Sequence, residues 1–451
     1  MLLHRRRFCA LAAAAAGATI AQQPASAEAG ALGINATQLG VRPDSSEDQT
    51  RTLQRAVDQA AGARRPLALP PGTYRVGEIR LPAGGSIVGV PGATRLVLIR
   101  GTALVSANRV DHVSLAGLTL DGAGHTLPEG RGLVHFSACR SVRVENCTIS
   151  SSGRIGLALE ATEGTVIGNS LTRSAESGIF SIDARGLLIA RNRIHNAANN
   201  GIQVWRTESG DDGTQVIDNR IEDVAAKAGG SGQNGNAINV FRAANVIVRG
   251  NRINGCAFSA IRGNSASNLQ ILGNNCTALG ETAIYAEFAF EGAIIANNIV
   301  DGAADGISVT NFNEGGRLAV VQGNVVRNLL PRGQALVDPN NRLGVGIGIE
   351  ADTACTGNVI ENAPRMGIGV GWGPHLRNVS VTGNIVRRAG IGIGVSVVPG
   401  SGAVLIADNM IAQAQRGAIL GLEWEKIVTG DLAREGSGAH AHLAIRGNRV
   451  Q

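Results

Sequence analysis

Asn169-Ser170-Leu171 followed by Gly178-Ile179 is one copy of a short motif that recurs along most of this chain. In each copy an Asn, a free position and an apolar residue are followed, nine residues after the Asn, by Gly-Ile or Ala-Ile. The base spacing of the Asn is 22 to 23 residues, with longer gaps where residues are inserted. Such a repeat predicts a solenoid in which each coil stacks on the next. The Asn positions are Cys147 (in place of Asn), Asn169, Asn192, Asn219, Asn251, Asn274, Asn297, Asn324, Asn358, Asn384, Asn409 and Asn448.

The apolar residues of the Gly-Ile segments alternate with a period of two, as in Ile202 and Val204 or Ile238 and Val240. A period of two is typical of a β-strand, whereas a helical repeat requires a period of 3.6. Stacked parallel strands lie ~4.8 Å apart, so twelve Asn positions predict a rod of roughly 55–60 Å. We therefore expect an all-β fold, a parallel β-helix.

One helix is expected, over residues 45–62. Ser45 and Asp48 are arranged like a capping box, and Gly62 stands where a helix ends. Three regions follow from this: an export signal over 1–27, an N-terminal cap over 28–62 that includes the helix, and the β-helix over 63–451. The insertion at 422–442 is expected to fold over the opposite end, because an uncovered strand edge invites self-association.

The first residues resemble a twin-arginine export signal. His4-Arg5-Arg6-Arg7-Phe8 precedes an alanine-rich stretch, and Ala25-Ser26-Ala27 is typical of a cleavage site. No other stretch reaches the ~20 apolar residues that a membrane span requires. We expect a soluble, exported protein, periplasmic or secreted, that meets the twin-arginine export machinery; an ordinary signal peptide is the alternative.

Composition excludes one class of partner and predicts no metal centre. Residues 1–27 hold three arginines and no acidic residue, so the net charge of +6 falls to +3 once they are removed. That charge is too small to favour nucleic acid. No Cys or His spacing suits a metal, and no cofactor is expected. Asp211-Asp212 offers a calcium loop, but its flanking glycines are more typical of a solvated turn.

Several segments resemble the pectin-lyase-like superfamily of right-handed parallel β-helices. Leu69-Pro-Pro-Gly-Thr-Tyr74 and Leu118-Thr-Leu-Asp-Gly122 are similar to its N-terminal signatures, and Arg42 to Leu53 is similar to its GDGxxDDT segment, with Ser45 in place of Gly. Together with the export signal, the chain resembles a bacterial family of twin-arginine-translocated uncharacterised repeat proteins. The superfamily includes lyases, hydrolases, epimerases and adhesins, and its catalytic motifs are largely missing from this sequence.

The outward positions of the Gly-Ile strands predict a binding groove over residues 180–290. Nine of the 13 aromatic residues fall on these strands or the turns after them, interleaved with polar side chains. Sugar rings stack on aromatic faces, and their hydroxyls or carboxylates need polar partners. A row of glycines, Gly348, Gly369 and Gly394, predicts a flat floor at one end. The alternative is that the aromatic residues pack on one another. The predicted substrate-binding residues are Phe180, Gln203, Trp205, Arg206, Asn239, Phe241, Arg242 and Asn264.

Two chemistries compete in this groove. For β-elimination or epimerisation of a uronate, Arg206, Arg242 or Arg262 offsets the carboxylate, and Arg262 or Tyr285 removes a proton. For hydrolysis, Glu287 and Glu350 lie two coils apart, roughly 10 Å, near the upper limit for an inverting pair. The candidate catalytic residues are Arg262, Tyr285, Glu287 and Glu350.

We therefore expect an exported protein that binds, and cleaves or epimerises, an acidic polysaccharide. A non-catalytic carbohydrate-binding or adhesin-like protein is one alternative, and a structural protein of the cell envelope is another. These three possibilities share the fold and differ in what the groove does.

Overall fold

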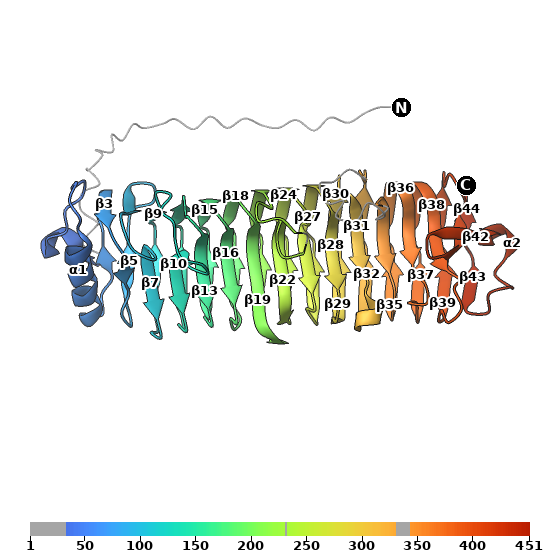
Figure 1. Ribbon diagram of the computed structural model, residues 1–451, viewed down its shortest axis with the longest axis horizontal. Coiled ribbons are helices and arrows are strands. Elements are labelled where there is room, and N and C mark those ends of the chain that lie inside the picture. The colour runs from blue at the N-terminus through green and yellow to red at the C-terminus, as the bar shows by residue number, and fades with distance from the viewer. Residues whose placement is uncertain (1–32, 231, 331–342) are drawn as a thin grey trace, which may run out of the picture.

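Each coil of the central solenoid contains three short strands. The computed structural model describes residues 33–230, 232–330 and 343–451, and shows a right-handed parallel β-helix, as expected (Figure 1). One coil consists of β17 (Leu188–Ala190), β18 (Arg193–Ala197) and β19 (Asn200–Asp211). The sequence pattern predicts two strands per coil and leaves out the middle one. That strand is short and contains a residue with positive φ, here Asn196, which masks its alternation.

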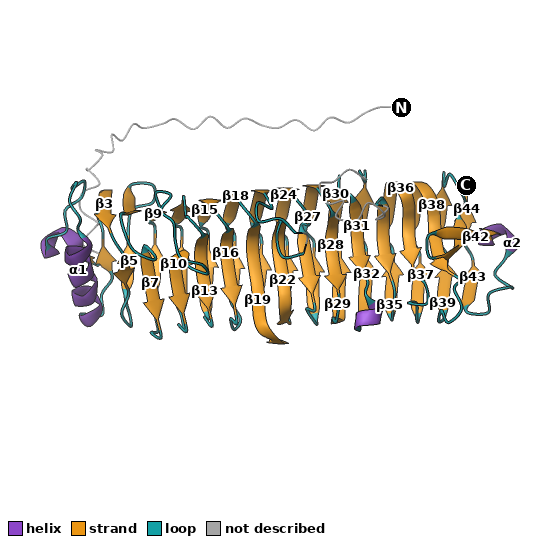
Figure 2. Ribbon diagram, in the orientation of Figure 1, coloured by secondary structure: helices purple, strands orange, loops and turns teal. Residues whose placement is uncertain are grey.

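The strands stack in parallel along the rod. The strands that precede the Asn positions form a 16-stranded sheet that runs from β1 (Ile34–Asn35) to β43 (Leu443–Arg446). Its 15 strand spacings correspond to about 70 Å. The two other strands of each coil form a 28-stranded sheet, so the rod is built almost wholly of strands (Figure 2). The Gly-Ile strands of this sheet are β10 (Gly132–Ser137), β13 (Ile155–Glu160), β16 (Ser177–Ile182), β19, β22 (Asn236–Ala244), β25 (Ile261–Asn264), β28 (Thr282–Glu287), β31 (Asp305–Val309), β34 (Val345–Ile349), β36 (Val359–Val370), β38 (Ile385–Ser396) and β41 (Ile419–Glu423).

Buried asparagines connect successive coils through a continuous ladder of hydrogen bonds. The Nδ2 of Asn219 donates to the carbonyl of Ile189 and to Oδ1 of Asn251, at 2.9 and 3.0 Å. One predicted position is wrong: Asn298, not Asn297, occupies the ladder and accepts from the backbone N–H of Asn274. Asn297 has φ +58° and holds the left-handed position that precedes every ladder residue. Both residues of the Asn-Asn pair fit the repeat spacing, so the spacing alone did not separate them.

The first helix lies at the N-terminal end of the rod (Figure 1). α1 (Thr50–Gly62) ends where predicted but begins at Thr50, later than the predicted start at residue 45. Asp44 adopts a positive φ, and the Gln49 side chain hydrogen-bonds both backbone groups of Arg42, so the segment before Thr50 forms a turn. The apolar face of α1 is buried against the first strands. The predicted export signal over 1–27 lies outside the described residues.

The insertion at 422–442 folds onto the last coil, as predicted. β42 (Lys426–Asp431) pairs antiparallel with β41, the last Gly-Ile strand, and so occupies its free edge. α2 (Leu432–Glu435) follows, and Leu432 is buried against β41, β42 and β43. No helix within 33–230, 232–330 or 343–451 is long and apolar enough to cross a membrane.

Candidate functional site

The outward residues of the Gly-Ile strands stand in rows, because each strand pairs in register with the next. The prediction that equivalent residues of successive coils lie one above the other is therefore confirmed. A second row contains Trp205, Phe241, Asn264 and Glu287. The first row reads Ala158, Phe180, Gln203, Asn239, Arg262, Tyr285, Ser308, Gly348, Gly369, Gly394 and Leu420.

Phe180, Trp205 and Phe241 form an aromatic ladder on the outer wall. Consecutive ring centroids lie 5.6 Å apart in edge-to-face geometry, and each ring is half-buried. The indole N–H of Trp205 donates to Oδ1 of Asn239 at 3.0 Å, and the Arg242 guanidinium lies 4.8 Å from the Phe241 ring centre. These rings contact one another, which is the geometry expected if they stabilise the outer wall by packing.

The buried polar residues beside this ladder are already hydrogen-bonded. Gln203 accepts from the Ser177 hydroxyl at 2.5 Å, and Asn239 donates to the carbonyl of Gly232 at 2.7 Å. Arg206, half-buried, donates to the carbonyl of Glu208 at 3.3 Å. Most of the predicted substrate-binding residues thus belong to a well-packed surface, and the main cleft lies further along the rod.

Arg262 is enclosed by two carboxylates and a ring. Its Nε and Nη2 donate to the two oxygens of Glu287 at 2.6 and 3.1 Å, and Nη1 lies 3.3 Å from Glu281. The guanidinium carbon sits 4.5 Å from the centre of the Tyr285 ring. Burial lowers the pKa of Arg262, but the charge and hydrogen bonds of Glu287, together with the charges of Tyr285 and Glu281, outweigh burial and raise that pKa. The Arg262 charge is therefore already balanced within the protein.

Tyr285 is poorly suited to remove a proton. Burial, together with the charge of Glu281, raises the pKa of its hydroxyl far above the ordinary value. Its phenolate form is thus disfavoured at neutral pH. The charge of Arg262 is already balanced by two carboxylates, and the Tyr285 hydroxyl stays protonated. These two residues are therefore poorly suited to β-elimination on a uronate.

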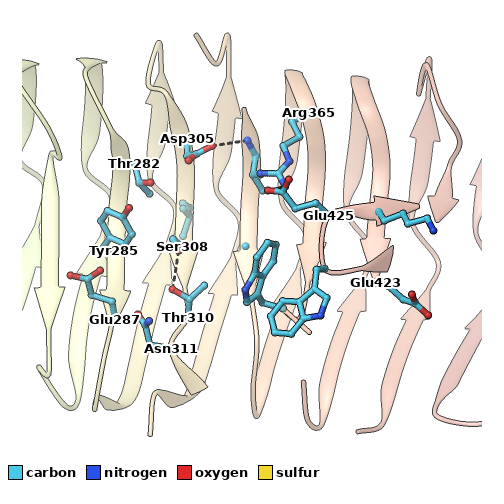
Figure 3. Close-up of a pocket in the computed structure, with 16 residues that line it drawn as sticks. Thr282, Tyr285, Glu287, Asp305, Ser308, Thr310, Asn311, Arg365, Glu423 and Glu425 are labelled. Carbon is cyan, nitrogen blue, oxygen red and sulfur yellow. Dashed lines mark hydrogen bonds and ion pairs between the residues drawn. The ribbon is translucent and has the colours of Figure 1, made fainter. Parts of the chain in front are cut away.

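A cleft opens beside this cluster and extends towards the C-terminal coils. It has a volume of about 870 Å³ and adjoins a smaller hollow of about 250 Å³ with which it shares residues such as Gly348 and Trp372. Figure 3 shows Tyr285 and Glu287 at one side, Asp305, Ser308 and Thr310 in the middle, and Arg365 with Glu425 at the other. The walls come from β28 and β31, from the loop after β36, and from the β41–β42 hairpin.

Two tryptophans from separate insertions form one wall. Trp372 and Trp424 have ring centres 5.4 Å apart at 79°, and remain 43% and 47% exposed. Gly373 permits this contact, because a Cβ there would lie 2.4 Å from the Trp424 ring. Trp424 itself has φ +55°, which is uncommon for a bulky residue and marks a constrained position. The rings are thus held apart from the core and exposed to the cleft.

Glycines form the floor, as predicted. Gly348, Gly369 and Gly394 follow one another in register, and all three line the smaller hollow. A Cβ at Gly348 would meet nothing within 4 Å, so the space above this residue is open. At Gly369 and Gly394 the Met366 sulfur comes close, and it closes the floor from one side. A ligand can therefore approach the backbone closely at Gly348, whereas Met366 and Leu422 cover Gly394.

A buried carboxylate, Glu350, and a half-buried one, Asp305, face the cleft and its adjoining hollow. Glu350 is 7% exposed and accepts from the backbone N–H of Phe312 at 2.7 Å. Burial raises the pKa of Glu350 to about 7, although hydrogen bonds from the backbone of Phe312 and Asn311 lower it. Asp305 accepts from the backbone N–H groups of Gly344 and Val345, both at 2.7 Å, and burial raises its pKa too.

The sequence-predicted residues divide into two groups. Tyr285, Glu287 and Glu350 line the cleft, and Arg262 with Asn264 stands beside Glu287. The other predicted residues belong to the aromatic ladder and its surroundings. The insertions at 371–378 and 422–442 were the signal for part of the lining outside the predicted set, because each inserts a tryptophan and polar side chains beside the glycine row. They contribute Trp372, Trp424, Glu425 and Lys426, whereas Asp305 and Arg365 lie on β31 and β36 and had no such signal.

Asp211-Asp212 is not a solvated turn. Asp212 is 3% exposed and its Oδ1 accepts from the backbone N–H of Thr214, while Asp211 accepts from Asn245 at 2.7 Å. The two side chains thus bind different partners. In the described part of the chain, no group of three His, Cys, Asp or Glu residues is placed to hold a metal ion.

Comparison with known proteins supports the architecture. The sequence matches the right handed beta helix region family over residues 96–232, 159–326 and 200–386. No match was found among curated protein sequences. A PL6 alginate lyase in complex with a trisaccharide is 14% identical, with 93% of this chain and 95% of that chain covered and a TM-score of 0.55.

Two further solved structures from phages were found to be similar to this chain. The N-terminal fragment of bacteriophage phi29 gene product 12 is 14% identical, with 93% of this chain and 66% of that chain covered and a TM-score of 0.50. ORF18 of Geobacillus virus E2 is 16% identical, with 62% and 57% covered and a TM-score of 0.49. This chain thus spans less than two thirds of either phage protein. At such identities the likeness shows the fold alone.

Proposed function

The chain belongs to the right-handed β-helix family, and on that premise we propose that it binds a polysaccharide in the Trp372–Trp424 cleft and hydrolyses its glycosidic bonds. The observation that carries this proposal is the pair of exposed indole rings above a floor of glycines, with buried carboxylates on the same cleft. Rings and carboxylates are what stacking and cleavage of a sugar chain require. The alginate lyase with its trisaccharide supports the proposal only at the level of fold.

Glu350 and Glu287 take the two roles of an inverting pair. Burial raises the pKa of Glu350 to about 7, so a large share of its carboxyl is protonated near neutral pH and can donate a proton to the leaving sugar oxygen as the C–O bond breaks. Burial raises the pKa of Glu287, whereas the charge of the Arg262 guanidinium lowers it; in its ionised form Glu287 accepts a proton from the water that attacks the anomeric carbon. The register places the two residues two strands apart, roughly 10 Å.

Hydrolysis fits the contacts better than the uronate chemistry. Arg262 is already balanced by Glu287 and Glu281, so it is not available to offset a substrate carboxylate. Export through the twin-arginine machinery and a periplasmic or secreted location remain part of the proposal. They rest on the sequence of residues 1–27.

Binding without cleavage is the second candidate. The observation that favours it is the two-point contact between Arg262 and Glu287, which holds both oxygens of the carboxylate expected to act as base. A polysaccharide would then be held by the same rings and floor, with no water activated beside it. Such a protein would act as a carbohydrate-binding or adhesin-like rod.

Two substitutions test the proposal. We expect Trp424→Ala to weaken polysaccharide binding about tenfold, because an exposed ring is lost without loss of core packing. Trp205→Ala, on the aromatic ladder, is the matched control and should leave affinity unchanged. Glu350→Gln should reduce release of reducing ends by a factor of roughly 10²–10⁴ while binding persists. Affinity is measured by calorimetry and cleavage by a reducing-end assay, on a panel of neutral, acidic and amino polysaccharides.

The outcomes separate the two candidates. If Trp205→Ala and not Trp424→Ala weakens binding, the cleft is the wrong site. If the protein binds a polysaccharide but releases no reducing ends from any of the panel, hydrolysis is excluded and the binding protein remains.

A further inference from the structure

Charge along the cleft is unbalanced towards carboxylates. Its lining includes two cations, Arg365 and Lys426, and four acidic residues, and the adjoining hollow adds a fifth. Arg365 pairs with Glu425 at 3.2 Å and also attracts Asp305, so it serves two carboxylates. The acidic residues that line the cleft and its adjoining hollow are Glu287, Asp305, Glu350, Glu423 and Glu425.

The cluster at the other side of the cleft repeats this pattern. Arg262, behind Tyr285, pairs with both Glu281 and Glu287. The buried Arg262 and the half-buried Arg365 thus each face two carboxylates, so among the described residues carboxylates outnumber guanidinium groups at both sides of the cleft. A cleft with walls of low dielectric concentrates such a field, so it repels polyanions and attracts cations.

The partners of Asp305 and Glu350 make these two residues distinctive. Each accepts hydrogen bonds from backbone N–H groups, and neither forms an ion pair with another described residue at the distances of a salt bridge. Backbone donors orient a carboxylate without neutralising it. Asp305 therefore faces the cleft as an acceptor for a positive or proton-bearing group, and Glu350 does so in its ionised form.

The wall formed by Trp372 and Trp424 also favours a cation. Indole is the aromatic ring that attracts a cation most strongly, and the faces of Trp372 and Trp424 remain accessible on the cleft. The rings also accept the apolar face of a sugar. Rings and carboxylates together thus match a sugar ring that carries an ammonium group.

We propose that the polysaccharide taken by this cleft is built of sugars with free amino groups, rather than of uronates or N-acetylated sugars. This inference rests on the proposed function, since it names the substrate class of the same cleft. Asp305 accepts the ammonium group, Trp372 and Trp424 stack on the sugars, and the open space above Gly348 lets a sugar lie close to the backbone. The acidic polysaccharide predicted from the sequence does not suit this charge.

The test compares three oligosaccharides that differ in charge. Hexamers of glucosamine, N-acetylglucosamine and galacturonic acid are titrated into the purified full-length protein by calorimetry. We expect the glucosamine hexamer to bind about tenfold more tightly than the N-acetylated one, and the galacturonate hexamer more weakly than both. The advantage of glucosamine should shrink as salt is raised, because charge pairing at an open cleft is screened.

Asp305→Asn removes the carboxylate charge but keeps a side-chain oxygen that can accept from the backbone N–H groups of Gly344 and Val345. It should abolish the preference for glucosamine while leaving the affinity for the N-acetylated hexamer unchanged. Glu129→Gln, on an exposed loop in the N-terminal coils, is the control and should alter neither affinity. Trp424→Ala should weaken binding of both hexamers.

The results distinguish the inference from the function on which it rests. If the N-acetylated or galacturonate hexamer binds as tightly as glucosamine, and Trp424→Ala still weakens binding, the amino-sugar inference is overturned and the polysaccharide cleft remains. If no hexamer and no polysaccharide of the panel binds, both are overturned. A glucosamine preference that Asp305→Asn leaves intact contradicts the role given to Asp305.

Discussion

At the scale of single residues, Glu350 couples the stability of the fold to pH. Its pKa is about 7 in the folded protein and near 4.5 when exposed to water. Because the folded state binds this proton more tightly, the stabilisation is fully present below about pH 4.5 and is lost as the pH rises through about 7. The change amounts to roughly 3 kcal/mol. Glu350→Gln should remove this part of the pH dependence, as measured by urea unfolding between about pH 5 and pH 8.

The control for this prediction is Glu129→Gln, whose side chain is exposed. It should retain the wild-type slope of unfolding free energy against pH. Equal slopes for wild type and Glu350→Gln would show that the Glu350 carboxyl is not desolvated.

The face of the strand on which a side chain lies was predictable wherever the repeat has a period of two. The period of two placed Phe180, Trp205 and Glu287 on the outer face, and pairing in register then aligned each with an outward residue of a neighbouring strand. The repeat does not determine which atoms pair. From the sequence alone Arg262 was expected to be a free cation, yet in the structure it lies between two carboxylates. Asp212, in a glycine-flanked turn, is buried because its carboxylate accepts from the backbone of Thr214.

At the scale of elements, the asparagine ladder holds neighbouring coils together. Oδ1 of Asn274 accepts from both the backbone N–H and the Nδ2 of Asn251, at 2.9 and 3.0 Å. Asn274→Ala leaves these buried donors without a partner, which should destabilise the protein by about 2–4 kcal/mol. Thermal unfolding followed by circular dichroism measures the loss.

Asn448→Ala is the matched control, because this last rung is only half-buried and water can replace its hydrogen bonds. Its melting temperature should fall by less than that of Asn274→Ala. An equal fall would indicate that burial of the ladder contributes little.

The elements themselves were predictable to different degrees. Parallel strands, the Asn corners and the end of α1 follow from the repeat and from a glycine stop. The third strand of each coil was not predictable, since residues with positive φ interrupt its pattern. The cleft was not either, because two insertions that are distant in sequence meet only through Trp372 and Trp424.

At the scale of the whole molecule, the C-terminal insertion protects one end of the rod. Leu432 is 4% exposed beneath β42 and anchors the segment that covers the edge of β41. Leu432→Asp places a charge there, so the segment should detach and the bared edge should pair with another molecule. Light scattering after size-exclusion chromatography should show a higher molar mass than for wild type.

Val428→Asp tests the specificity of this effect, because Val428 lies on the same hairpin with 37% of its surface exposed. It should leave the molar mass unchanged. If Leu432→Asp also keeps the wild-type mass, the edge of β41 needs no cover.

The asparagine ladder has a consequence for how such rods change in evolution. Each rung both offers and receives the same hydrogen bonds, so a duplicated stretch of about 23 residues would find matching partners above and below it. Growth or shortening of the rod by one coil therefore leaves the remaining contacts intact. Coils next to the glycine row are the exception, since an extra one there would separate Trp372 from Trp424.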